Sequence, residues 1–68
     1  MLLLQYFIFD ASGNEILEAS AFQCKDENEL NDLTKEVIHN YKTQPVFKDV
    51  NLLLSSGNKV LFNSREKN

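Results

Sequence analysis

A short apolar run near the N-terminus constrains the fold of this chain more than any other feature. Residues 2–9 read Leu-Leu-Leu-Gln-Tyr-Phe-Ile-Phe, so the run is apolar at both odd and even positions. Its shortness and the turn sequence directly after it favour a strand over a helix. A helix that crosses a bilayer needs about 20 apolar residues, and no positively charged segment precedes the run. We therefore expect a buried strand and no membrane association.

The chain is short enough for one small domain only. It has 68 residues, of which 43% are apolar and 25% are charged, and this balance is typical of globular proteins. Residues 64–68 contain nothing apolar to bury. The sequence predicts a single domain over residues 1–63 and a disordered polar tail over residues 64–68.

A second strand is expected over residues 15–23, joined to the first by Asp-Ala-Ser-Gly-Asn at residues 10–14. Asp followed three residues later by Gly is typical of a type I turn. A three-residue hairpin loop would pair Ile8 with Ile16, whereas a two-residue turn at Gly13-Asn14 would pair Phe9 with Glu18. The first register keeps apolar side chains together, and we prefer it.

Residues 26–44 have the period of an amphipathic helix. The apolar stripe consists of Leu30, Leu33, Val37, Ile38 and Tyr41. Asp26 is a suitable N-cap and Glu29 follows it three residues later, as in a capping box. Pro45 disfavours helical geometry at Gln44 and predicts the end of the helix there.

Residues 46–63 are predicted to form a second hairpin around Ser56-Gly57-Asn58, a turn sequence that repeats Ser12-Gly13-Asn14. The repeat indicates either an old duplication or independent use of good turn residues. A three-residue loop would place Leu52 opposite Val60 and Val50 opposite Phe62.

The element order ββαββ predicts an α+β fold, namely a four-stranded antiparallel sheet with the strands in the order 2-1-3-4 and one helix packed on one face. This order places the most apolar strand in the centre and the more polar strands at the edges.

One helix covers one face of such a sheet, although the first strand is apolar on both. Leu3, Phe7, Phe9, Leu17, Ala19 and Ala21 would share one face, and Leu2, Leu4, Tyr6, Ile8, Ile16 and Phe22 the other. Either the uncovered set contacts a partner, or the polar tail and the loop at residues 45–49 fold back over it. The predicted interface consists of Leu4, Tyr6, Ile8, Ile16 and Phe22.

Charge and cysteine content limit the classes of function. Ten acidic residues against seven scattered basic ones give a net charge of −3, which argues against nucleic-acid binding as the main role. Tyr6 and Phe22 could still stack the bases of a single strand, and this is the alternative function. Cys24 is the only cysteine, so no intrachain disulfide can form, and we expect a reducing cytoplasm.

Acidic residues gather on one side of the predicted helix, where Glu29, Asp32 and Glu36 are spaced three and four apart. They form either a solvated face or a contact for a basic partner. The single histidine, His39, lies off the apolar stripe. No catalytic, cofactor-binding or metal-ligand motif occurs in the sequence, so we expect neither an enzyme nor a cofactor.

These observations predict a small non-catalytic protein–protein interaction module. It would self-associate as a homodimer through an exposed sheet face or edge, or bind an unidentified protein partner as an accessory or inhibitor protein. The biological process is not indicated by any residue pattern.

Overall fold

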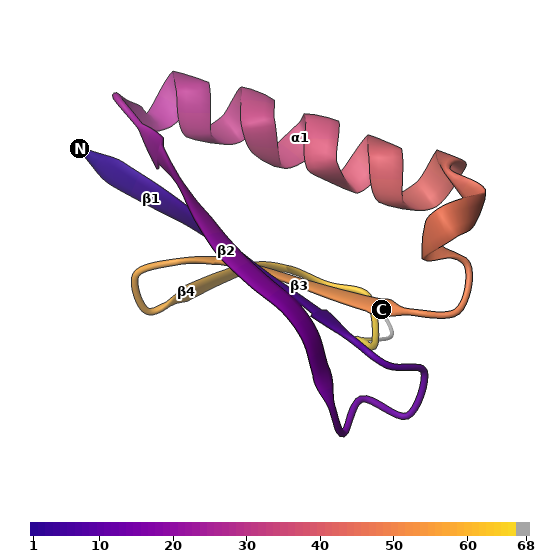
Figure 1. Cartoon of the computed structure of the whole chain (residues 1–68). Helices are drawn as coiled ribbons and strands as arrows, with labels where there is room; N and C mark the ends of the chain where they lie inside the picture. The colour runs from indigo at the N-terminus through magenta and orange to yellow at the C-terminus, as the bar shows by residue number, and fades with distance from the viewer. Residues whose placement is uncertain (67–68) are drawn as a thin grey trace.

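A computed structural model describes residues 1–66 as a four-stranded antiparallel sheet with one long helix lying along one side (Figure 1). The elements are β1 (Leu2–Phe9), β2 (Ile16–Cys24), α1 (Glu27–Thr43), the short 3-10 helix η1 (Pro45–Phe47), β3 (Asn51–Ser56) and β4 (Lys59–Asn63). The strands lie in the order β2-β1-β3-β4. The predicted α+β fold, its ββαββ order and its strand order are therefore confirmed.

The helix begins and ends where its sequence predicts. The Asp26 side chain accepts a hydrogen bond from the Glu29 backbone N–H at 2.9 Å, and the Glu29 carboxylate accepts one from the Lys25 N–H at 3.3 Å. Gln44 is extended, with φ −93° and ψ 126°, because Pro45 follows it. The predicted stripe faces the sheet, with Leu30 buried and the other four members half-buried against the core.

The first hairpin has neither of the predicted registers. Tyr6 pairs with Ser20 and Ile8 with Glu18, and a bulge then pairs Phe9 with Ile16. The Asp10 carboxylate causes this shift, because it accepts hydrogen bonds from the backbone N–H groups of Asn14 and Glu15 at 3.0 and 3.3 Å. The loop thus holds four residues, Ala11 to Asn14, instead of three.

The predicted register of the second hairpin is also wrong. Ser56 pairs directly with Lys59, which leaves a two-residue turn with Gly57 at φ 60° in its first position. Positive φ at that position is what a type II′ turn requires. With a further bulge between Leu54 and Ser55, Leu54 lies opposite Phe62, and Val60 lies opposite Ser55 on the other face.

The core lies between α1 and the sheet. Its buried members are Leu4, Cys24, Leu30, Leu52 and Leu54. Since successive strand residues point to opposite faces, the even-numbered residues of β1 face the helix and the odd-numbered ones face away. Leu4 is 0% exposed, so it belongs to the core, contrary to the prediction that it lies on an open face.

Hydrogen bonds join the start of β3 both to the first hairpin and to Ser64, the residue after β4. The Asn51 side-chain amide donates to the backbone oxygens of Asp10 and Ala11 at 3.0 and 3.2 Å. The Ser64 hydroxyl accepts from the Leu52 N–H at 2.9 Å, and the Ser64 N–H donates to the Leu52 oxygen at 3.0 Å. Ser64, which the sequence places in a disordered tail, is therefore bonded to β3, whereas residues 67–68 of that tail lie outside the described residues.

None of the helices formed within residues 1–66 combines the length and the apolar character that crossing a membrane requires.

Candidate interaction surfaces

Within residues 1–66 no helix covers the sheet face turned away from α1, and this face carries many apolar side chains. We call it the open face. Its apolar members are Leu3, Phe7 and Phe9 from β1, Ile16, Ala19 and Ala21 from β2, Leu53 from β3 and Val60 from β4. Ile16 and Val60 are each 56% exposed, and Leu3 is 42% exposed. The rings of Phe7 and Phe9 lie side by side, with their centroids 6.5 Å apart.

The open face continues into β2, which is one of the two edge strands. Eight of its nine residues are exposed, and only the last, Cys24, is buried. Edge strands are usually protected from other chains by lysine, proline or short length. β2 contains neither lysine nor proline, and its single charged residue is Glu18. Its free edge crosses the front of the molecule in Figure 1, with the lower half extending away from the helix.

The structure separates the five residues of the predicted interface into three places. Leu4 is in the core. Ile16 pairs with Phe9 and lies on the open face. Tyr6, Ile8 and Phe22 remain together on the helix side, where they line a groove. The prediction that these three contact a partner stays a prediction, but they do not share a surface with Ile16.

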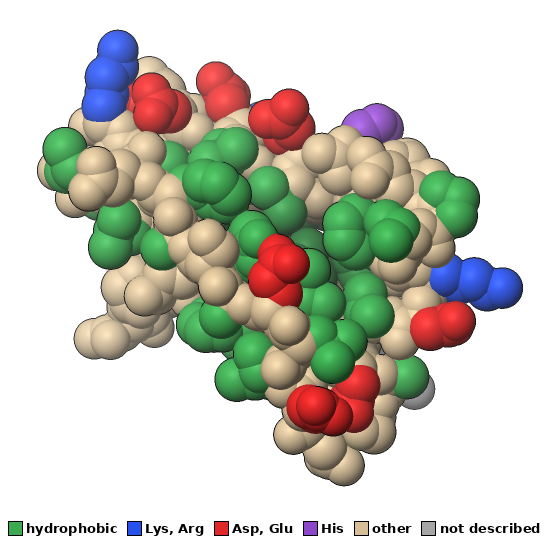
Figure 2. Space-filling view, in the orientation of Figure 1, with side chains coloured by type: hydrophobic (Ala, Val, Ile, Leu, Met, Phe, Trp, Pro, Cys, Tyr) green, Lys and Arg blue, Asp and Glu red, His purple; other side chains and the backbone are tan. Residues whose placement is uncertain are grey.

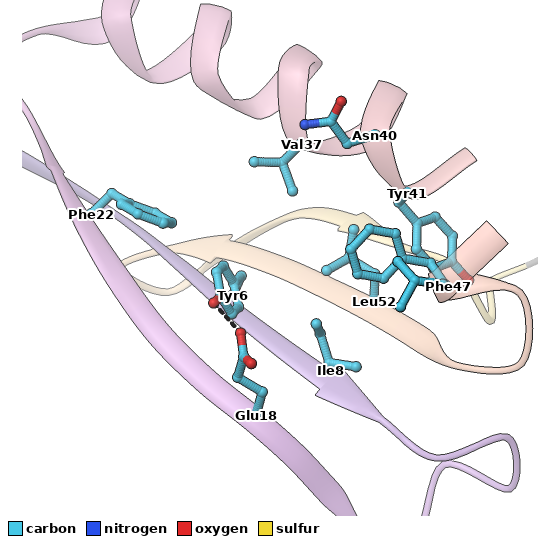
Figure 3. Close-up of a pocket in the computed structure, with 10 residues that line it drawn as sticks. Tyr6, Ile8, Glu18, Phe22, Val37, Asn40, Tyr41, Phe47 and Leu52 are labelled. Carbon is cyan, nitrogen blue, oxygen red and sulfur yellow. Dashed lines mark hydrogen bonds between the residues drawn. The ribbon is translucent and has the colours of Figure 1, made fainter. Parts of the chain in front are cut away.

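The groove lies between β2 and the C-terminal half of α1 and has a volume of about 330 Å³. Tyr6, Ile8, Phe22 and Leu52 line it from the sheet, and Val37 lines it from the helix. Tyr6 and Phe22 stand on one side of it, while Tyr41 and Phe47 stand on the other (Figure 3). We call this site, defined by those four rings together with Glu18 and Asn40, the aromatic groove.

A tyrosine–carboxylate pair lies on the strand side of the aromatic groove. The Tyr6 hydroxyl donates a hydrogen bond to the Glu18 carboxylate on the neighbouring strand (Figure 3). This hydrogen bond raises the pKa of the Tyr6 hydroxyl, and partial desolvation and the negative charge of Glu18 act in the same direction. The pair holds the Glu18 carboxylate beside the ring of Tyr6. Figure 2 shows an acidic side chain among apolar ones near the centre of the view.

The opposite wall is held by contacts with the chain that follows the helix. The Tyr41 hydroxyl donates to the Val50 backbone oxygen at 2.7 Å. Its ring lies 6.1 Å from that of Phe47 and 6.2 Å from that of Phe62, measured between centroids. Because these contacts come from three different segments, the wall is fixed in the folded chain.

The predicted acidic residues of the helix do lie on its outer surface. Glu29, Asp32 and Glu36 are all exposed and line a shallow depression near the start of α1. The Glu29 carboxylate already caps the helix through the Lys25 N–H. Within residues 1–66 no group of three or more His, Cys, Asp or Glu side chains has the arrangement of a metal site. His39 is exposed, as its place off the stripe predicts.

Two features of these surfaces were not predicted from the sequence. The aromatic groove is formed by residues of β1, β2, α1 and η1. These segments meet only in the folded chain, so no local sequence pattern indicates the groove. The open face also brings Arg65 against Gly13 and beside Phe9. No protein-family model, curated protein or solved structure matches this chain.

Proposed function

We propose that this protein is a non-catalytic interaction module that forms a homodimer through the open face and the adjoining edge of β2. The observation that carries the proposal is the exposure of eight of the nine residues of β2, an edge strand without lysine or proline. Such an edge can pair with a strand of a second chain. The apolar side chains of the open face would then continue across the contact.

The order of the strands supports the same surface. β1 contributes Leu3, Phe7 and Phe9 to the open face directly beside β2, so the apolar area and the free edge are continuous. The other edge strand, β4, has only five residues and begins with Lys59. A pairing partner is therefore expected at β2 and not at β4.

Cys24 is free and fully buried, which is compatible with the reducing cytoplasm that we propose as the place of action.

Single-stranded nucleic acid is the weaker candidate for the open face. Tyr6 and Phe22, the predicted stacking residues, lie on the helix side of the sheet instead. The rings on the open face are Phe7 and Phe9, and Arg65 is the basic residue that lies beside Phe9. Binding of a nucleic-acid strand relies on several Lys or Arg side chains along its phosphates, and the net charge of −3 acts against it.

Sedimentation velocity over a 100-fold dilution series tests the proposed dimer. The purified chain should change from dimer to monomer with dilution, and Ala19→Lys and Ala21→Lys should shift the dissociation constant upward by at least about tenfold, since each places a charge in the apolar contact. Both positions are exposed and hold small side chains, so the substitutions remove little packing from the monomer.

Asn31→Lys provides the matched control, because Asn31 is exposed on α1, away from the open face. It adds the same charge and should leave the dissociation constant within twofold of the parent. A chain that stays monomeric at every concentration, or a dimer that Ala19→Lys and Asn31→Lys weaken equally, would contradict the proposal. A gel-shift titration with a labelled oligonucleotide should show no binding at physiological salt.

A further inference from the structure

The aromatic groove has a chemical character that differs from that of the open face. Four aromatic rings stand around it in two pairs, Tyr6 with Phe22 at 5.7 Å and Tyr41 with Phe47 at 6.1 Å between centroids. The pairs come from opposite walls, the first from the sheet and the second from the end of α1 and from η1 (Figure 3). A ligand between them would meet ring surfaces on two sides.

The charge in the groove has one sign. Among the lining residues that the structure describes, Glu18 is the only charged one. Lys42, the basic residue in the last turn of α1, has its ammonium group over the ring of Phe62, 5.9 Å from the centroid, and does not line the groove. A negative charge without a basic neighbour in the lining favours a cation as ligand and disfavours an anion.

The aromatic walls determine what kind of cation fits. A metal ion needs several oxygen or nitrogen ligands, whereas the groove offers one carboxylate and the Asn40 amide, and both of its tyrosine hydroxyls donate hydrogen bonds to other groups. Aromatic rings attract ammonium groups through the negative charge of their faces, and rings arranged around a site are the usual way in which proteins recognise alkylated ammonium groups. The remaining apolar lining, which includes Ile8, Val37 and Leu52, suits the carbon atoms of such an ion.

We propose that the aromatic groove binds a small alkylated ammonium ion, with Glu18 as its counter-charge and the rings of Tyr6, Phe22, Tyr41 and Phe47 around it. The volume of about 330 Å³ is at the lower end of the range for small-molecule sites. Asn40 offers a side-chain amide at the rim for a polar substituent of the ligand. The site lies on the helix side of the sheet, opposite the open face, although Glu18 and Phe22 belong to β2, the strand whose edge the proposed dimer uses.

Choline is a suitable probe, and 3,3-dimethyl-1-butanol is its neutral counterpart of the same shape. Each is titrated into the isotope-labelled protein while amide shifts are followed by NMR. Choline should shift the amides of residues around the groove, and the neutral alcohol should bind at least about fivefold more weakly, because the attraction to the rings and to Glu18 depends on the charge. Equal binding of the two, or choline shifts located away from the groove, would overturn the proposal.

Two variants assign the roles of the carboxylate and the rings. Glu18→Gln keeps a hydrogen-bond acceptor for Tyr6 and should weaken choline binding at least about fivefold. Glu15→Gln removes a carboxylate that is also exposed but lies outside the groove, and it should change choline binding less than twofold. Phe47→Leu should weaken choline binding but leave the neutral alcohol unaffected. Equal effects of Glu18→Gln and Glu15→Gln would overturn the assignment of Glu18, and unchanged helix content by circular dichroism confirms that each variant is folded.

Discussion

The two hairpins contain the same Ser-Gly-Asn turn sequence, yet they contribute to the molecule in different ways. β3 supplies two of the five buried core side chains, Leu52 and Leu54. β2 supplies one, Cys24, at its very end, and is otherwise exposed. The turns also differ. Gly13 is the last residue of a turn in which its N–H donates to the Asp10 backbone oxygen, whereas Gly57 is the first residue of a two-residue turn.

β3 therefore contributes mainly to the stability of the fold, whereas β2 mainly provides exposed surface. The two middle strands, β1 and β3, form the core with α1. β2 pairs with one strand only, β1, and exposes most of its side chains to solvent. The different turn geometries also favour independent use of good turn residues over a duplicated hairpin. Four measurements test how far the two hairpins differ.

The largest difference is expected between leucines of the two hairpins. Leu54→Ala should destabilise the fold by about 2–5 kcal/mol, because Leu54 is fully buried and its loss leaves a cavity. Leu17→Ala in β2 should change the free energy of unfolding by no more than about 0.5 kcal/mol, since Leu17 is 53% exposed. Urea unfolding followed by circular dichroism measures both. Similar losses for the two variants would show that β2 carries core packing after all.

The two turn glycines provide the next comparison. Gly13 and Gly57 have φ 79° and φ 60°, so alanine at either position should cost about 1–2 kcal/mol. The Cβ of Gly13→Ala would meet the guanidinium of Arg65, the far end of a flexible and exposed side chain that can move aside, whereas the space beside Gly57 is open. Removing Arg65 should therefore change the cost of Gly13→Ala by no more than about 0.5 kcal/mol, measured by urea unfolding in the parent and in an Arg65→Ala background. A larger difference would show that Arg65 is fixed against the first turn.

Asp10 makes the first hairpin, but not the second, sensitive to acid. The hydrogen bond from the Ser12 hydroxyl, assisted by backbone N–H groups, lowers the pKa of the Asp10 carboxyl from its usual 3.8. The folded state therefore favours the ionised form, and this contribution is complete above pH 3.8 and is lost as the pH falls through the lower folded pKa. Asp10→Asn should be less stable than the parent at pH 7, and the difference in stability should narrow as the pH falls below 3.8. Asp49→Asn removes a carboxylate outside both turns and is the control. A difference in stability between Asp10→Asn and the parent that stays constant with pH would contradict this role of Asp10.

The smallest effect is expected at high pH and concerns Tyr6. Its pKa is raised above 10.0 by the hydrogen bond to Glu18, so its contribution to stability is present below pH 10 and is lost as the pH rises through the folded pKa. Ultraviolet absorbance of the Tyr41→Phe variant isolates the ionisation of Tyr6. Adding Glu18→Gln should lower the midpoint of that titration. An unchanged midpoint would mean that the pair does not form in solution.

The strand and helix order could be predicted from the sequence because each element has its own clear pattern. The run at residues 2–9, the stripe from Leu30 to Tyr41 and the break at Pro45 are local features, and the structure confirms them. The registers could not be predicted in this way, because in the first hairpin they depend on side-chain hydrogen bonds and in the second on the turn at Gly57 and on a bulge. The Asp10 carboxylate binds the Asn14 and Glu15 N–H groups and lengthens the loop by one residue.

The sheet face that the helix covers could not be predicted from β1 alone either, because both faces of β1 are apolar. The neighbouring strand decides it, because β3 brings Leu52 and Leu54 to the face of Ile8 and Tyr6. To the other face it brings one leucine, Leu53, between the polar residues Asn51 and Ser55. The face with the two leucines is the more apolar one and therefore receives the helix. The aromatic groove depends on this choice, which explains why three of the predicted interface residues lie in it and Leu4 lies beneath the helix.

The central position of β1 also sets the order in which the chain can fold. β1 can pair with β2 through a nearby loop, but its pairing with β3 joins residues as far apart as Gln5 and Ser55. Closing so long a stretch of chain is the slow step in proteins rich in non-local contacts. The arrival of β3 is thus expected to limit the folding rate, and until it arrives the first hairpin presents apolar side chains on both sides to any neighbouring chain.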